Sequence, residues 1–237
     1  MAGAALAGAA RPVKRFYKEA TAVGGEIRLD GRPVRTPARR LLAIPSERLT
    51  QAIAAEWAAQ DDRIDPVTMP LTGLANAAID RAAPDKEAFA RGLAAYGESD
   101  LLCYRAEAPP GLVERQAALW DPILAWARRR YDVDFTLASG VVHRPQPCAT
   151  VERLAHAVAA RSAFELAALA PLVTISGSLV IALALAEEAI GVEPAWSAAA
   201  LDEQWQAEQW GEDAEAARAL AVRRRDFKAA CRFLALL

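Results

Sequence analysis

The chain has 237 residues, enough for one large domain or two small ones with their own hydrophobic cores. Hydrophobic residues make up 54% and charged residues 24%, which excludes a disordered chain, and the abundant alanine favours helices over an all-β fold. The formal net charge of −2 excludes a globally basic nucleic-acid-binding protein. Three widely spaced cysteines and two histidines predict neither a disulfide framework nor a metal site, and they favour a reducing, cytosol-like compartment.

Charge is distributed unevenly along the chain. Between Arg11 and Arg48 there are ten basic and four acidic residues, whereas residues 187–215 contain nine carboxylates and neither lysine nor arginine. This pattern predicts either two surfaces with different roles or two surfaces that face each other. A third interpretation, two solvated faces without a ligand, stays equally open.

The N-terminal part of the chain predicts short strands. Residues 1–10 are small and apolar and are expected to form a flexible tail. Glu26–Leu29 alternates polar and apolar residues, as a half-buried strand does, and Asp30-Gly31 supplies a tight turn toward a second extended run at 40–44. Prolines at 33, 37 and 45 keep these strands short. Residues 11–45 are therefore expected to form a small antiparallel β-rich domain.

Residues 46–237 are expected to form a larger helical domain, so the predicted fold class is α+β. Ser46 is a helix cap, and Leu49, Ile53 and Trp57 recur at four-residue spacing on one face of the first helix. We therefore assign Trp57 a structural role in that face. Further helices are predicted at 71–82, 86–96, 112–131, 151–160, 164–170, 172–190, 195–210 and 214–236, with a short strand at 134–138.

An uncharged stretch at 166–186 is as long as a membrane-spanning helix. Pro171 and Gly177 interrupt it, however, and glutamates flank it where lysine, arginine or an aromatic belt would be expected. A helix buried at the centre of the helical domain is the better prediction. We expect no stable membrane insertion.

The motifs of common enzyme sites are absent. No Gly-Lys pair exists, which excludes a P-loop, and no glycine-rich dinucleotide fingerprint follows a strand. H-E-x-x-H, C-x-x-C and G-x-S-x-G are also missing. The sequence therefore predicts no catalytic residue, no nucleotide, no cofactor and no metal ligand.

The segment 201–211 has the most informative pattern. On a helix, Leu201 and Trp205 share an apolar face, while Asp202, Gln206 and Gln209 line up on an adjacent one. A glycine at 211 then ends the helix. Tryptophans interleaved with glutamines and carboxylates suit a surface that recognises another protein. Equally, the tryptophans could be core residues and the polar row could be solvated.

Several segments together resemble a known family in both order and spacing. They are KRFYK (14–18), LDGRPVRTP (29–37), AEWAAQ (55–60), IDP (64–66), MPLT (69–72), DLLCYR (100–105), WDP (120–122) and LDE (201–203), followed by Gln206 and Trp210-Gly211. The chain resembles the assembly chaperone that handles the alpha subunit of the F-type ATP synthase catalytic head. The aromatic at Tyr17 is often tryptophan in that family, and Asp202 stands where glutamate is common.

The resemblance implies a small N-terminal β domain, a larger helical domain and a non-enzymatic role. Such a chaperone would hold the unassembled alpha subunit until the beta subunit replaces it, in the bacterial cytoplasm or, for a eukaryotic chain, the mitochondrial matrix. The expected partner-binding residues are Asp202, Glu203, Gln206, Gln209 and Trp210, and the expected structural residues are Trp57, Trp120 and Gly211.

Two alternatives from other classes stay open. One is an enzyme with a pocket lined by carboxylates between Asp202 and Glu215, which would need a carboxylate of raised pKa. The other is an RNA-binding module in the basic N-terminal segment. That segment has the charge for nucleic acid, but Phe16 and Tyr17 are its only aromatic residues.

Overall fold

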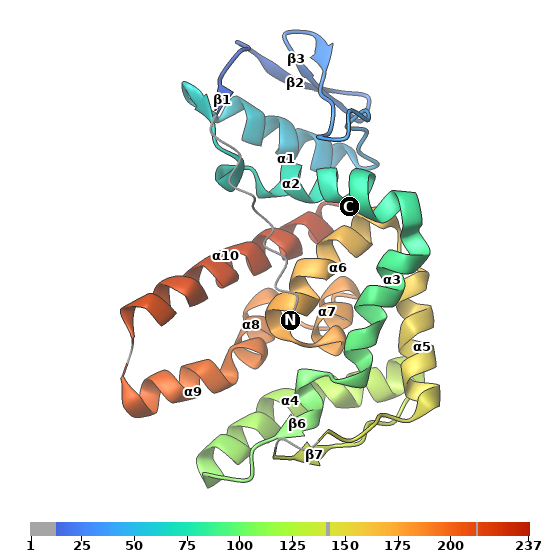
Figure 1. Ribbon diagram of the computed structural model, residues 1–237, viewed down its shortest axis with the longest axis vertical. Helices are drawn as coiled ribbons and strands as arrows, with labels where there is room; N and C mark the ends of the chain where they lie inside the picture. The colour runs from blue at the N-terminus through green and yellow to red at the C-terminus, as the bar shows by residue number, and fades with distance from the viewer. Residues whose placement is uncertain (1–12, 141–142, 212) are drawn as a thin grey trace.

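The computed structural model describes residues 13–140, 143–211 and 213–237 (Figure 1). The predicted tail at 1–10 lies outside the described residues. A small antiparallel sheet lies at one end of the molecule, and helices form the rest, so the predicted α+β class is confirmed.

The sheet follows the predicted hairpin closely. Strands β2 (Ala20–Val23), β3 (Glu26–Leu29) and β4 (Arg32–Pro33) pair in the order β2-β3-β4, all antiparallel. Asp30 and Gly31 both have positive φ angles, 48° and 79°, as the tight turn between β3 and β4 requires. The run 40–44 returns beside the sheet through isolated bridges instead of a continuous strand.

Helix α1 (Glu47–Ala58) packs against β2 and β3, and β1 (Val13–Lys14) pairs with β5 (Arg63–Ile64), which follows α1. Ser46 caps α1 as predicted, because its side chain accepts a hydrogen bond from the N–H of Leu49. The domain boundary at 45/46 stays a prediction, and the structure places α1 in direct contact with the sheet.

The helical part contains nine further α-helices among the described residues. They are α2 (Pro70–Ala77), α3 (Lys86–Ala94), α4 (Pro110–Tyr131), α5 (Cys148–Ala159), α6 (Ala163–Ser176), α7 (Leu179–Ala186), α8 (Val192–Ala199), α9 (Leu201–Trp210) and α10 (Ala214–Ala235). A π-helical segment, η2 (Ala78–Ala82), extends α2, and β6 (Tyr104–Arg105) pairs in parallel with β7 (Ala138–Ser139). The sequence predicts a short strand at 134–138, whereas β7 begins at Ala138, the only residue that the two ranges share.

Two of the predicted helix boundaries are wrong. Helix α6 continues through Pro171 and ends at Gly177, whose φ of 68° is left-handed, and Ser178 then caps α7. The predicted helix 195–210 is divided at Ala200, where α8 ends and α9 begins. Both breaks lie at packed positions, since Ser178 and Ala200 are fully buried.

Helix α7 forms the centre of the core. Its residues Leu179–Ala184 are completely buried, and α4, α6, α8 and α10 pack around it. The N-terminus of α7 is capped by Asp100, a fully buried carboxylate that accepts hydrogen bonds from the N–H of Val180 (2.9 Å) and the N–H of Leu102 (3.0 Å). The stretch 166–186 is thus mostly buried, as predicted, although Thr174 is exposed and the stretch forms two helices. No helix within the described ranges combines the length and apolarity that crossing a membrane requires.

Two tryptophans of the predicted structural set lie in the packed interior. Trp120 on α4 is completely buried, and its Nε1–H donates to the carbonyl of Ala198 (2.9 Å). Trp57 is half-buried in the last turn of α1, where its ring lies edge-on to Tyr17 with 5.8 Å between centroids. It packs against the core cluster that contains Leu49 and Ile53.

We call the N-terminal segment with its strands β1 to β4, residues 13–45, the sheet module. We expect Trp57→Ala to lower the free energy of unfolding by about 3 kcal/mol, since the ring packs between Tyr17 of the sheet module and the core. Thermal unfolding measures this. Trp57→Phe is the matched control, because Nε1 of Trp57 has no hydrogen-bond partner among the described residues and phenylalanine keeps the ring contact. A Trp57→Ala protein that melts with the wild type would contradict the structural role.

Candidate functional site

A cleft of about 350 Å³ lies where α9, α10 and the end of α6 meet. Three of the five predicted partner-binding residues, Asp202, Glu203 and Gln206, line it from α9. Arg223 lines it from α10, and the remaining walls are mainly apolar or small, among them Leu101, Trp120 and Ile175. The cleft therefore combines a polar row on one helix with an apolar floor from the core.

Asp202 is half-buried and is held in place by Gln116, a residue that the sequence analysis does not predict at this site. One of its carboxylate oxygens accepts a hydrogen bond from Nε2 of Gln116 (2.9 Å). Gln116 is almost fully buried on α4, and its own Oε1 accepts from the N–H of Ala106 (2.8 Å). No ion pair to Asp202 occurs within the described part of the chain. The cleft thus holds a carboxylate that is oriented but not neutralised.

Glu203, by contrast, is paired across the cleft. Its carboxylate lies 2.5 Å from Nη1 of Arg223, and the other guanidinium nitrogen of Arg223 donates to the carbonyl of Ile175 at the end of α6 (2.9 Å). This bridge connects α9, α10 and α6. Glu203 and Arg223 therefore help to hold the cleft in shape.

Further contacts between α9 and α4 lie outside the cleft. The ring of Trp205 lies under the guanidinium of Arg115, 4.9 Å from the ring centroid, and Arg115 also pairs with Glu208 (2.8 Å). A Cβ at Gly111 would come within 2.9 Å of the Trp205 ring, so glycine permits this close approach. Trp205 is thus a packing residue.

The end of α9 projects from the helical body (Figure 1). Trp210 is 78% exposed there, the largest exposed fraction of any large hydrophobic residue in the described part of the chain. Gln209 is also exposed but does not line the cleft, so the structure separates it from Asp202, Glu203 and Gln206. Gly211, with φ 89°, ends the helix as predicted.

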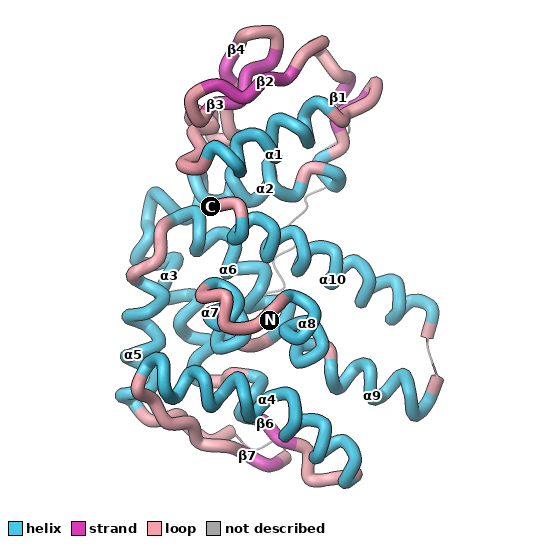
Figure 2. Tube along the Cα trace, turned by 180° about the vertical axis from the view of Figure 1, so that it is seen from behind, coloured by secondary structure: helices cyan, strands magenta, loops and turns pink. Residues whose placement is uncertain are grey.

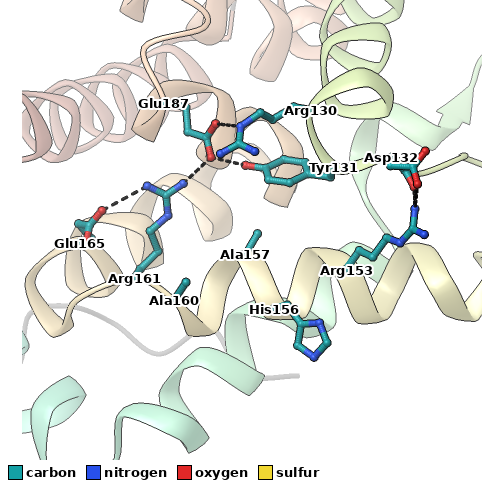
Figure 3. Close-up of a pocket in the computed structure, with 10 residues that line it drawn as sticks. All are labelled: Arg130, Tyr131, Asp132, Arg153, His156, Ala157, Ala160, Arg161, Glu165 and Glu187. Carbon is teal, nitrogen blue, oxygen red and sulfur yellow. Dashed lines mark hydrogen bonds and ion pairs between the residues drawn. The ribbon is translucent and has the colours of Figure 1, made fainter.

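A second, larger pocket of about 880 Å³ lies between α4 and α5 (Figure 3). Glu187 is its central group and accepts bonds from Arg130 (2.5 Å), Arg161 (2.7 Å) and the hydroxyl of Tyr131 (2.8 Å). The other two carboxylates of the pocket are paired as well, Glu165 with Arg161 and Asp132 with Arg153. Its charged groups therefore neutralise one another.

Two carboxylates of the larger pocket have pKa values lower than usual, whereas a general acid needs a raised one. Hydrogen bonds and ion pairs outweigh burial at Glu165 and Glu187 and hold the pKa of each below its usual range. Burial raises the pKa of Asp100 to about 6 and also raises the pKa of Glu56. Both of these, however, accept backbone N–H groups at helix N-termini and line neither pocket.

Glu56 connects two of the segments that carry the resemblance noted above. Its carboxylate accepts from the N–H groups of Leu71 and Thr72, both at 2.8 Å, and from the hydroxyl of Thr72. The AEWAAQ segment on α1 thus caps the MPLT segment that begins α2. These two motifs serve helix packing, whereas LDE at 201–203 lines the cleft.

Comparison with known proteins agrees with this structure. The family model described as "ATP12 chaperone protein" matches residues 14–128. The crystal structure of Atp12 from Paracoccus denitrificans superimposes with a TM-score of 0.89 at 40% sequence identity, over 94% of this chain and 97% of that one. The chain belongs to the ATP12 chaperone family. This confirms the family predicted from the sequence, a family of ATP synthase assembly chaperones.

Two further ATP12 relatives extend the comparison. A putative chaperone from Agrobacterium tumefaciens has a TM-score of 0.89 at 43% identity, over 95% of this chain and 86% of that one. The protein atp12, mitochondrial, of Schizosaccharomyces pombe is 27% identical over 84% of this chain and 74% of its own length. The similarity thus includes bacterial proteins and a mitochondrial one.

Proposed function

We propose that this ATP12 chaperone binds the unassembled alpha subunit of the F-type ATP synthase catalytic head and keeps it from aggregating until the beta subunit replaces it. An unassembled subunit exposes a large apolar interface, which must be covered to stay soluble. The observation that carries the proposal is the row Asp202, Glu203 and Gln206 in a cleft on α9, the helix whose far end carries the exposed Trp210.

The cleft suits a cationic side chain of the partner. Asp202 is oriented by Gln116 and has no ion pair among the described residues. An arginine or lysine of the partner would form an ion pair with its carboxylate. The apolar floor at Leu101 and Ile175 can cover the aliphatic part of such a side chain. Trp210 would then act as a separate anchor at the end of α9, because tryptophans dominate the energetics of many interfaces.

Release of the subunit requires no nucleotide in this scheme. The sequence lacks the glycine-rich motifs that hold phosphates, so exchange for the beta subunit supplies the driving force. We infer a cytoplasmic location for a bacterial chain of this family and the mitochondrial matrix for a eukaryotic one.

The proposal is tested with purified alpha subunit, whose aggregation is followed by light scattering without ATP. We expect the wild-type chain to suppress aggregation. Trp210→Ala should raise the dissociation constant at least tenfold, because truncation removes an anchor worth roughly 2 kcal/mol or more. Its melting temperature should stay unchanged, since the side chain is 78% exposed.

Val67→Ala is the matched control, because Val67 is also exposed but lies in the 3₁₀ turn η1 (Pro66–Thr68), away from the cleft. It should bind the alpha subunit as the wild type does. Failure of the wild-type chain to hold the alpha subunit would overturn the proposed function. If Trp210→Ala binds the alpha subunit as tightly as the wild type does, Trp210 does not contribute to the interface.

A further inference from the structure

Four arginines cluster where the sheet module meets the helical part. Arg35, Arg39 and Arg40 belong to the turn after β4, and Arg81 lies in η2 directly after Asp80. All four are exposed, and none forms an ion pair within the ranges 13–140, 143–211 and 213–237. We call this set the arginine turn.

The backbone of the arginine turn is held in place by Asp80. The carboxylate of Asp80 accepts from the hydroxyl of Thr36 (2.7 Å) and from the N–H of Ala38 (3.0 Å). Nη1 of Arg40 donates to the carbonyl of Ile79 (2.7 Å). Asp80 is therefore occupied by the backbone and hydroxyl groups of the turn, and the turn presents its arginines from a fixed position.

Two of the arginines are not explained by local structure. Arg39 adopts a left-handed φ of 64°, a conformation that glycine or asparagine takes more easily. Neither Arg39 nor Arg81 donates a side-chain hydrogen bond to another described residue, whereas Arg35 and Arg40 bond to backbone carbonyls. The guanidinium groups of Arg39 and Arg81 thus have donors to offer an external anion.

The acidic stretch 187–215 does not supply that anion. Four of its carboxylates pair with cations of the helical part: Glu187 with Arg130 and Arg161, Glu193 with Arg224 and Lys228, Glu203 with Arg223, and Glu208 with Arg115. No ion pair joins the two oppositely charged regions among the described residues. In Figure 2 the sheet module lies at one end of the molecule, whereas α9 projects from the side of the helical part.

We propose that the arginine turn is a second docking surface, which binds an acidic segment of the client polypeptide; this rests on the proposed function. Arginine guanidinium groups donate paired hydrogen bonds to carboxylates, and an unpaired basic surface speeds the capture of an acidic partner. Pro33 on the edge strand β4 has no N–H to donate, which disfavours strand addition at this edge.

A polypeptide suits the arginine turn better than a nucleic acid does. Single-stranded nucleic acids bind to surfaces that combine basic groups with aromatic rings for stacking. The exposed aromatic of the module, Phe16, packs instead beside Tyr17, which contacts Trp57 in the last turn of α1. The arginine turn itself contains no aromatic residue.

The test compares the double variant Arg39→Glu/Arg81→Glu with Arg91→Glu/Arg129→Glu in the full chain. Both change the net charge by the same amount, but Arg91 and Arg129 lie on α3 and α4, outside the turn. We expect the first variant to slow capture of purified alpha subunit about tenfold at low salt and the second to act like the wild type. Salt should slow capture by the wild type and have little effect on the first variant.

Each outcome distinguishes this proposal from the proposed function. If the wild type does not capture the alpha subunit, the proposed function fails. If the wild type captures it and both double variants match the wild type, the client does not contact the arginine turn. Binding of a polyuridine RNA that Arg39→Glu/Arg81→Glu abolishes, with client capture unchanged, would assign the turn to nucleic acid and overturn the proposal.

Discussion

Replacing Asp100 with alanine should lower the free energy of unfolding by about 2–4 kcal/mol and the melting temperature by roughly 10 °C. The substitution leaves the N–H groups of Val180 and Leu102 buried without an acceptor, and each such group costs roughly 1–3 kcal/mol. Because α7 is the centre of the core, water cannot reach these groups in place of the carboxylate. Thermal and denaturant unfolding measure the loss.

Asp85→Ala is the matched control for this result. Asp85 caps α3 through the N–H of Ala88 (3.0 Å), but it is exposed, so water can replace its carboxylate. Its removal should cost only about 1 kcal/mol. Equal, small losses for the two variants would show that Asp100 contributes no more than a surface cap does.

Asp100 also makes stability depend on pH. Burial raises its pKa from 3.8 to about 6 in the folded protein, so the folded state binds more protons than the unfolded state between these values. The free energy of unfolding is therefore highest below about pH 4 and falls as the pH rises through about 6, by about 3 kcal/mol in total. Asp100→Ala is compared with the wild type near pH 4, where the contribution of this group is complete. Asp100→Asn, which does not titrate, should lack this part of the pH profile.

Asp202→Lys should weaken binding of the alpha subunit by about 2–5 kcal/mol, because it places a cation where the partner's cation is expected. The sequence alone predicts little effect on folding. Since Asp202 is half-buried and accepts from Gln116, we now expect a loss of stability of about 1 kcal/mol as well. Binding and melting must therefore be measured on the same preparation.

Asp202→Asn separates the two effects. The asparagine oxygen can still accept from Nε2 of Gln116, so this variant should melt with the wild type, yet it has no charge to offer the partner. We expect binding weaker than wild type and stronger than Asp202→Lys. If Asp202→Asn binds fully and Asp202→Lys only loses stability, the carboxylate is a structural group and the interface lies elsewhere.

The elements that the sequence predicts correctly are those with local signals. Glu26–Leu29 alternates with period two and is followed by Asp30-Gly31, and Ser46 caps α1. The break at Ala200 has no such signal, because alanines precede Leu201 and no capping side chain is present. It lies beside Ala198, whose carbonyl accepts from Trp120 seventy-eight residues earlier, so long-range packing accounts for what the local sequence lacks.

In the candidate site, too, local spacing predicts some residues correctly, whereas long-range packing determines the others. Helical spacing places Asp202 and Gln206 on one face, and both line the cleft. The same spacing includes Gln209, which lies beyond the cleft, because the pattern contains no information about where the neighbouring helices end. Ile175 and Arg223 form the other walls and come from distant segments. Gln116 orients Asp202, but nothing in the sequence distinguishes it from any other polar residue of an amphipathic helix.

The two halves of α10 are held very differently. Its buried residues, Phe227, Ala230, Cys231 and Phe233, all lie in the C-terminal half, whereas residues 214–225 are mostly exposed. If the proposed client contacts this outer half, it must order the long side chains there, at about 0.5–1.5 kcal/mol of lost entropy for each one immobilised. That entropy is regained when the client leaves, so contact with an outer half that contains no buried residue would shorten the lifetime of the complex and favour handover to the next partner.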